Sequence, residues 1–566
     1  MMMTKGFTMK LGRIENIAKR ISGFSLWIWL IFIFLAGIKL FLVGGQHEYA
    51  IGFAGHDDRL FINLAVNLMH FEWLGDFNNL TLIKGPFYPI WIVFTHISHI
   101  PLLVSEHLLY AAACIILILG LKPIFKRNWP LLIIYAVVLF NPVSFANGPA
   151  TRVIRDGLYQ PLTLLFVSLS IGLVLRLRKK SRKLFLWSGS AGLILSALWL
   201  TREEGVWLLP FLAIVMIYSI FSIWREGIRS LKKKLLIIFM PLIILFFSIN
   251  ILSAINYYEY GIYNVVELKT PEFLSAYGAM TRVKGDQWIR DVPVSTQKRL
   301  EIYPFSPTFS KLKPFFEGDL GTRWTSASVA NSEKNGVNEI KGGWFLWAFR
   351  DAVAQAGYYS DGNKVLNFYQ KMADEINSAC NQKKLDCYPK RASMTPPWNN
   401  NYNEPLKEDV LKSIAYVSKL QGFSATPAES TGDDDSLRLF SSITYERTSS
   451  EPNDSLRLGI LNFIGKLYRL LLPTSLLLAV VTFLLNIFKK NVLRNVSWII
   501  CFSLAVAILS RIALLSIINT TSFYAIDILY FSPMYSLILL FILLNLLSIT
   551  FWTESKIIGK NYDHES

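Results

Sequence analysis

Two adjacent acids near the start of the chain are the first residues whose types and positions could do chemistry. Asp57 and Asp58 follow Gly-His and precede an amphipathic stretch that runs from Leu60 to about Leu74. One acid in this position is explained by capping of a helix, but capping does not require two. The pair could also supply a general base, or it could ligate a divalent cation through hard carboxylate oxygens.

Six of the seven histidines lie in or beside the same stretch; they are His47, His56, His70, His96, His99 and His107. Imidazole tolerates both apolar and aqueous surroundings, so a position at a membrane interface explains several of them. A zinc site would require the histidines to converge, and the sequence does not show this. His56 stands directly before the acid pair, so we expect it to contact a substrate bound there.

A lysine and a short charged connection follow. Lys84 precedes Gly-Pro-Phe-Tyr-Pro, where it could anchor the chain at a membrane surface or hold a phosphate. Arg202, Glu203 and Glu204 join two apolar runs with almost no spacer. Ionisable side chains this close to hydrocarbon are paired or functional, so an internal ion pair and a substrate site both fit.

A third charged segment reads Thr-Arg-Val-Ile-Arg-Asp-Gly over residues 151–157. Arg152 and Arg155 stand there beside Asp156, directly before an apolar run. If this segment is extracytoplasmic, the two arginines lie on the side where basic residues are uncommon. They then need a partner, which could be Asp156, anionic lipid or a phosphate ligand.

Long apolar runs must position these residues. The chain has 566 residues, 52% of them hydrophobic, and a mean hydropathy of +0.38. Ten runs are long enough to cross a bilayer core of about 30 Å, and they cover residues 24–43, 105–121, 130–146, 158–175, 184–200, 205–222, 234–256, 459–488, 495–518 and 526–551. We therefore predict an α-helical polytopic membrane protein.

The basic residues decide the predicted topology. Clusters before position 21 and at 122–127, 176–183 and 225–234 all fall on the cytoplasmic side if the short apolar stretch 86–100 does not span. That stretch carries prolines and two histidines, so we expect an interfacial helix. The net charge of +17 is then topological, and nucleic-acid binding is excluded. Every charged candidate named above lies on the outer side.

The polar stretch between the seventh and eighth runs divides the chain. We predict a transmembrane module over 1–256, a mixed extracytoplasmic domain over 257–458, and transmembrane helices with a cytoplasmic tail over 459–566. The aromatic residues near position 345 fit either a glycan- or peptide-binding surface or a small core. Residues 425–455 are predicted to be a linker. Cys380 and Cys387 could form a disulfide in an oxidising compartment, and the sequence leaves this open.

At these residues the chain resembles the GT-C superfamily, in particular dolichyl-phosphate-mannose protein mannosyltransferases and lipid A aminoarabinose transferases. Those families carry an Asp-Glu pair before an amphipathic helix, matched here by Asp57 and Asp58. Their Lys-Pro-Pro or His-Pro-Pro motif resembles the sequence from Lys84 to Pro86, and an acid in their second outer loop resembles Asp156. The resemblance covers about residues 20–256. Asp58 replaces the usual Glu, and Gly85 replaces the first proline.

The resemblance implies an inverting glycosyltransferase that takes its sugar from a polyprenyl phosphate and passes it to an extracytoplasmic glycan, lipid or protein. It implies a bacterial plasma membrane protein whose site faces the outside or periplasm. Some relatives need Mg²⁺ or Mn²⁺, for which Asp57 and Asp156 would be the ligands. A flippase or transporter of lipid-linked sugars and a non-catalytic assembly protein are the alternatives.

The roles that the resemblance implies are divided between acids and cations. Asp57, Asp58 and Asp156 are the expected catalytic acids. The expected substrate-binding residues are His56, Lys84, Arg152, Arg155, Arg202, Glu203 and Glu204.

Overall fold

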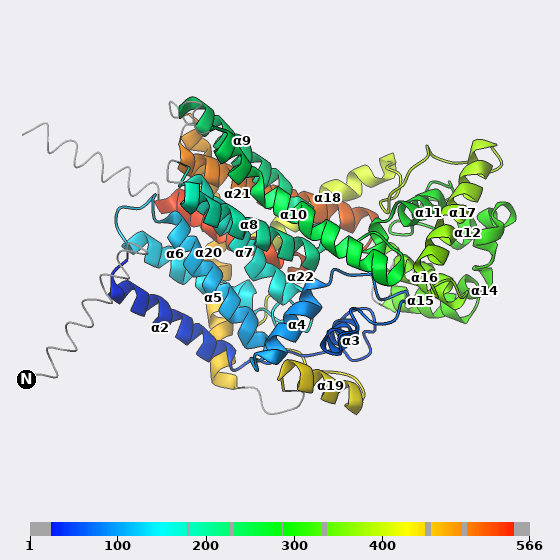
Figure 1. The fold of residues 1–566 in the computed structure, drawn as a ribbon, viewed down its shortest axis with the longest axis horizontal. Coiled ribbons are helices and arrows are strands. Elements are labelled where there is room, and N and C mark those ends of the chain that lie inside the picture. Colours follow the sequence, from blue (N-terminus) through cyan, green and yellow to red (C-terminus); the bar gives the residue numbers. More distant parts are fainter. Residues whose placement is uncertain are drawn as a thin grey trace, which may run out of the picture.

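The computed structural model describes residues 24–177, 181–226, 231–285, 287–330, 337–447, 454–488 and 495–547. Within these ranges every regular element is a helix, and the only β-type pairings are isolated bridges. Nine helical segments are long and apolar enough to cross a membrane. They are α2 (Leu26–Val43), α5 (Leu102–Leu121), α7 (Asp156–Val174), α8 (Ser181–Thr201), η2 (Glu203–Leu208) with α9 (Leu209–Glu226), α10 (Leu231–Tyr260), α20 (Ser455–Ile487), α21 (Val496–Thr521), and the run Ile528–Leu547 that begins with α22 (Ile528–Phe531) and η8 (Ser532–Met534). The chain is therefore an α-helical polytopic membrane protein (Figure 1).

The predicted span over 130–146 is not one continuous helix. It consists of α6 (Trp129–Leu139), which is only 11 residues long, and the 3₁₀ helix η1 (Pro142–Phe145). Pro142 cannot donate a backbone hydrogen bond, so the α-helix ends before it. The break is satisfied by buried Lys39 of α2, whose Nζ donates to the carbonyl of Leu139 (2.9 Å) and to Oγ of Ser144 (2.7 Å).

The segment of α6 and η1 nevertheless carries the chain across the bundle. Arg176, just beyond α7, donates to the carbonyl of Gly120 near the end of α5, and Glu106 near the start of α5 lies against Gly157 at the start of α7. Both helices therefore run in the same direction, and the residues between them must return to the starting side. The tenth crossing is present in a shorter and broken form, which is a correction to its predicted helix.

Two short helices lie beside the start of α5, at the end of the bundle that carries the polar insert. The predicted amphipathic helix is α3 (Asp58–Met69), which packs against α4 (Phe87–Ile97). The predicted interfacial stretch 86–100 contains helix α4, which has 11 residues. Helix α4 also packs on α8 and α5. It is too short to cross a membrane, so its prolines do not interrupt a crossing.

The insert is helical in its described residues, not mixed. A second hydrophobic core, which includes Phe345, Phe349 and Tyr369, holds its helices together. A disulfide joins Cys380, in the last turn of α17, to Cys387. The insert elements are η4 (Glu267–Lys269), α11 (Pro271–Thr281), α12 (Thr296–Ile302), η5 (Tyr303–Phe305), α13 (Pro307–Ser310), α14 (Lys313–Phe316), α15 (Asp319–Ala330), α16 (Gly342–Gln355), α17 (Gly362–Asn381), η6 (Asn400–Tyr402) and α18 (Asn403–Ser418).

The predicted linker over 425–455 is also corrected. It contains α19 (Asp434–Thr444), an amphipathic helix that packs on α3 and α4. Its apolar side chains Phe440 and Ile443 are buried, which explains why a segment rich in serine, threonine and acids still folds against the bundle.

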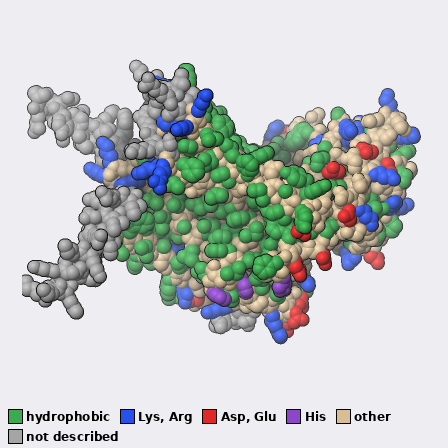
Figure 2. Space-filling view, in the orientation of Figure 1, with side chains coloured by type: hydrophobic (Ala, Val, Ile, Leu, Met, Phe, Trp, Pro, Cys, Tyr) green, Lys and Arg blue, Asp and Glu red, His purple; other side chains and the backbone are tan. Residues whose placement is uncertain are grey.

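The charges are distributed along the bundle in the way that the predicted topology leads us to expect. Figure 2 shows lysines and arginines gathered at the left end of the bundle, an apolar middle, and acids mainly over the insert and loops at the right. Exposed apolar side chains such as Phe34, Leu193 and Phe246 belong to the apolar middle. The basic residues before position 21 and parts of the clusters at 176–183 and 225–234, which helped to orient the chain, lie outside the described residues, as does the tail after position 547.

Labelling of single cysteines tests this arrangement. Native Cys114 and Cys501 are buried and the other two cysteines form a disulfide, so the wild-type protein gives no background. We expect Glu72→Cys to react with a membrane-impermeant maleimide on intact cells, and Lys126→Cys to react only after permeabilisation, because these exposed positions lie at opposite ends of the bundle. Labelling of both on intact cells would contradict the topology.

Candidate functional site

The first pair of the site joins Asp57 and Lys84. Lys84 Nζ forms an ion pair and hydrogen bond with Asp57 Oδ1. The Asp57 side chain makes no capping bond to α3, so the capping explanation for this acid is wrong. The Asp57 side chain is 48% exposed, whereas that of Lys84 is 7% exposed. An accessible carboxylate therefore lies over a buried cation.

Gly85 shows why this chain departs from the proline of the resembling families. Its backbone N–H donates to Glu203 Oε1 at 2.9 Å, a bond that proline cannot make. A Cβ at position 85 would overlap the carbonyl oxygen of Leu200 at the end of α8. The glycine therefore lets the Lys84 backbone approach the connection between α8 and α9.

Asp58 has a different environment from its neighbour. Arg152 donates to both carboxylate oxygens, with a shortest distance of 2.6 Å, and the backbone N–H of Ile51 donates a further bond. The Asp58 side chain is 1% exposed. Tyr49 and Arg152 also pair through their backbones. Asp58 thus joins the first loop to the segment 151–157, and its carboxylate is fully occupied.

Glu203 connects the same segment to the turn after α8. Arg155 Nη1 lies 3.2 Å from Glu203 Oε2 and also donates to the carbonyl of Thr201. Glu203 accepts the bond from Gly85 as well. The three loops expected to form the site therefore meet through direct polar contacts.

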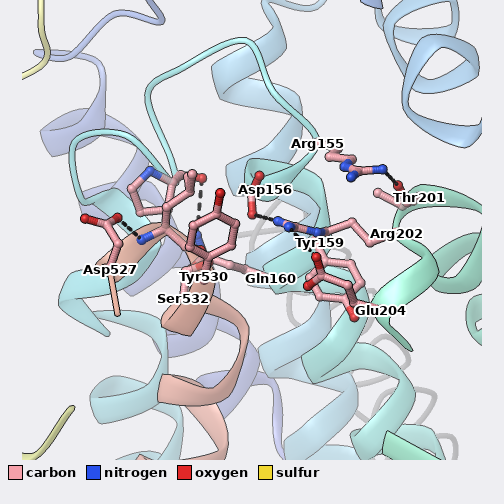
Figure 3. Close-up of polar contacts among 12 residues, drawn as sticks. Arg155, Asp156, Tyr159, Gln160, Thr201, Arg202, Glu204, Asp527, Tyr530 and Ser532 are labelled. Atoms are coloured by element: carbon pink, nitrogen blue, oxygen red, sulfur yellow. Dashed lines mark hydrogen bonds and ion pairs between the residues drawn. The ribbon is translucent and has the colours of Figure 1, made fainter. Parts of the chain in front are cut away.

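A second, deeper set of charges is centred on Arg202 (Figure 3). Its guanidinium pairs with Asp156 at the start of α7 and with Glu204 at 3.1 Å. Glu204 also pairs with Arg511 of α21 at 3.1 Å, and Arg511 donates to the carbonyl of Tyr530. This set ties the second and third loops to the C-terminal spans.

The sequence analysis missed Arg511, although a signal was present. Arg511 is a lone charge inside the apolar run 495–518, and charges inside spans are usually paired or functional. Its side chain is completely buried. Nothing local indicated that its partner would be Glu204, which lies 307 positions earlier.

The insert also reaches the site. His56 packs edge-on against Trp347 and Trp324, with ring centroids 4.4 and 5.4 Å apart. Its Nε2 lies 3.9 Å from Asp351 Oδ1, and Lys84 Nζ lies 5.8 Å from the Trp347 ring. Phe345 and Phe349 are core residues, as the small-core alternative predicts, while Trp347 borders the site.

The two neighbouring acids differ in electrostatics. Desolvation alone would raise the pKa of Asp57, but the charge and hydrogen bond of Lys84, assisted by Arg152 and Arg155, hold that pKa below its ordinary value. Desolvation raises the pKa of Asp58 despite its bonds to Arg152. Burial lowers the pKa of Lys84 against the pull of Asp57. Asp57 is therefore the acid held ionised.

The arrangement does not fit a metal ion. Asp57 faces Lys84 and Asp156 faces Arg202, so each expected ligand is already paired with a cation. In the described part of the chain, no group of three or more His, Cys, Asp or Glu side chains is placed to hold a metal. We therefore assign no step to a metal. The histidines are dispersed as well: His47 bonds to the carbonyl of Ala428, and His96 to that of Ile443.

Comparison with known proteins gives little further information. No family model and no curated protein matches the chain. Among solved structures, it is similar to two crystal structures of ArnT from Cupriavidus metallidurans, one bound to undecaprenyl phosphate and one in the apo state. Identity is 11% and 10% and the TM-scores are 0.29 and 0.27, over 90% of this chain and 77% of each of those chains. At these TM-scores the likeness supports no conclusion about this protein.

Removing Arg202 should destabilise the fold. Arg202→Met would leave Asp156 buried without its cation, which costs about 3–5 kcal/mol when one partner of a buried pair is removed. We expect a clear fall in the apparent Tm of the detergent-purified protein. Lys407→Met is the matched control, because Lys407 forms an exposed pair with Glu404 and such pairs contribute little. Equal Tm values for the two variants would contradict the role of Arg202.

Proposed function

We propose that this protein is a glycosyltransferase that moves a sugar from a polyprenyl-phosphate donor to an extracytoplasmic acceptor. The observation that carries the proposal is the pair of an accessible Asp57 carboxylate and a buried Lys84 cation. The pair lies at the insert end of a bundle of apolar helices. A donor anchored in lipid would bring its phosphate to this depth, and the sequence resemblance to GT-C enzymes points to the same chemistry. On this proposal the protein is in a bacterial plasma membrane, with the site facing outward.

The cations nearest to Asp57 are suited to receive the donor phosphate. Lys84 and Arg155 interact electrostatically with each other and with Asp57, so an anionic group held near Asp57 would be attracted by both. Each now bonds a carboxylate, Asp57 and Glu203 respectively. A phosphate would replace Asp57 as the partner of Lys84, because it offers more acceptor oxygens and more negative charge. Arg202 and Arg511 lie deeper and hold the loops in place.

The exchange of partners couples donor binding to activation of the base. Once Lys84 turns to the phosphate, the pKa of Asp57 rises, because the dominant lowering interaction is weakened while desolvation persists. Asp57 then accepts the proton of the acceptor hydroxyl as its oxygen forms a bond to the anomeric carbon. The bond from that carbon to the phosphate oxygen breaks, and its electron pair stays on the phosphate, stabilised by Lys84 and Arg155. Attack opposite the leaving group inverts the anomeric configuration.

The alternative of a transporter finds less support. It would place polar residues inside the spans and broken helices near the middle of the membrane. The described chain does contain a break between α6 and η1, but Lys39 fills it by bonding the Leu139 carbonyl and Ser144. The charged residues of the candidate site lie at the insert end of the bundle, where an extracytoplasmic acceptor can reach them.

Substitution of the proposed base tests the reaction. With purified protein, radiolabelled polyprenyl-phosphate sugars and membrane extract as the acceptor source, we expect Asp57→Asn to lower transfer by about 10²–10⁴-fold, the usual contribution of a general base. Binding of the donor should persist. Asp76→Asn is the control, because Asp76 is an exposed acid of the same loop. Undiminished transfer by Asp57→Asn, or no transfer with any donor, would refute the proposal.

The pH dependence tests the link between Lys84 and Asp57. In the wild type the depressed pKa of Asp57 keeps the base ionised down to below about pH 4, the ordinary range of an aspartate. In Lys84→Met the desolvation is less opposed, so the pKa of Asp57 rises and the acidic limb of residual kcat/KM moves to higher pH. Lys269→Met, which removes another lysine near Glu203, should leave the acidic limb in place. An identical limb in Lys84→Met would contradict this coupling.

A further inference from the structure

A cavity of about 300 Å³ adjoins the candidate site at Asp58. It lies between the first loop, the first two turns of α3 and the start of α19. Asp58, the neighbour of Asp57, is part of its wall. Its lining residues are Ala50 and Gly52 from the loop, Asp58, Arg59, Ile62 and Asn63 from α3, and Asp433, Asp435, Ser436, Leu439 and Phe440 from α19. Its volume is at the lower end of small-molecule sites, so it admits a compact group.

Helix α19 is held over this cavity at both ends. Before the helix, Thr431 exchanges backbone hydrogen bonds with Ala50 and Gly52. After it, Glu446 accepts bonds from the backbone N–H groups of Leu103 (3.0 Å) and Glu48 (3.4 Å). The ring of Tyr445 stacks on His96 at 5.2 Å. The cavity is therefore a built feature, because its roof is fixed to the bundle on two sides.

The Glu446 carboxyl that anchors α19 is buried near other acidic side chains. Burial raises the pKa of Glu446 to about 7, against the bonds from Leu103 and Glu48. Burial and the neighbouring Glu106, Glu446 and Asp58 carboxylates also raise the pKa of Glu48. Both buried carboxyls are therefore protonated more readily than exposed ones.

The polar groups of the lining are mixed. Asp58 is neutralised by Arg152, and Asp433 caps α19 by accepting bonds from Ser436. Arg59 supplies donors, Asp435 supplies acceptors, and an amide such as that of Asn63 supplies both. Two acids beside Arg59 disfavour a phosphate, while Arg59 disfavours a cation. Hydroxyl groups, which donate and accept, match this set best.

Part of the cavity wall is apolar. Ile62 and Phe440 are buried, and Leu439 is 38% exposed with its side chain at the cavity. A sugar ring has polar hydroxyls at its edge and C–H groups on its faces, so it presents both surfaces to such a cavity. A peptide hydroxyl would use the polar groups but leave much of the apolar wall uncovered.

We propose that this cavity, which Asp58 joins to the candidate site, binds a carbohydrate acceptor. The assignment rests on the proposed glycosyltransferase function and specifies its acceptor class. It gives a role to α19, because the helix and its N-cap residue supply five of the lining residues: Asp433, Asp435, Ser436, Leu439 and Phe440. Asp58 and Arg152 then form the boundary between the acceptor cavity and the donor side.

The test measures binding of methyl glycosides of glucose, mannose and N-acetylglucosamine to the full-length protein in detergent, by saturation-transfer NMR. We expect binding of at least one glycoside to the wild type. Leu439→Trp should fill the cavity and weaken that binding by about tenfold or more, since both the apolar contact and the hydrogen bonds are lost. Leu300→Trp is the matched control, because Leu300 is an exposed leucine of the insert outside the cavity.

A second pair of variants separates the cavity from the helix that roofs it. Asp434 and Asp435 both stand in the first turn of α19, but only Asp435 lines the cavity. Asp435→Asn should therefore weaken glycoside binding while Asp434→Asn does not. Equal effects of the two variants, equal binding by the two tryptophan variants, or binding of N-acetylserine amide in place of every glycoside would overturn the assignment.

The donor side is measured separately with undecaprenyl phosphate. Leu439→Trp should bind it as the wild type does, because Leu439 is remote from Lys84 and Arg155. If the wild type fails to bind undecaprenyl phosphate, the proposed donor is wrong. Glycoside binding that Leu439→Trp abolishes would still support the cavity, so the two failures are distinguishable.

Discussion

A charge buried at the edge of a membrane is stable only when an opposite charge is held against it, since water cannot compensate it there. Arg202 is a residue of this chain to which that constraint applies. It is buried between Asp156 at the start of α7 and Glu204 in η2, at the start of the span that continues as α9. Glu204 also pairs with Arg511 of α21. These pairs fix the relative positions of helices from both ends of the chain.

The remaining parts of the site depend on this framework. Because the turn after α8 is held in place, Glu203 can accept the Gly85 N–H and pair with Arg155. That contact brings the backbone before α4 into position, and Lys84 then lies beneath Asp57. The accessible carboxylate is thus the last member of a series of ion pairs whose other members are largely or wholly buried. Asp57 is therefore the member that a ligand can most readily displace from its cation.

Asp57 and Asp58 illustrate how environment divides two identical side chains. Asp58 is buried, and both of its carboxylate oxygens accept hydrogen bonds from Arg152. It therefore connects the first loop to the segment 151–157. Asp57 keeps about half of its surface exposed and has a single cation beneath it, so it can meet a substrate. The same division appears in α16, where Phe345 and Phe349 fill a core while Trp347 lies against His56.

The sequence by itself determined the class of protein, the order of its spans and the loops that carry charge, because hydropathy and basic clusters are local properties of the chain. It could also identify Asp57, Lys84, Arg152, Arg155 and Arg202 as candidates, since charges at the ends of apolar runs are conspicuous. Tertiary structure alone decided which acid pairs with which cation, how Lys39 satisfies the break after α6, where α19 packs and which partner Arg511 has. These features depend on contacts between residues up to hundreds of positions apart, and no local pattern records such contacts.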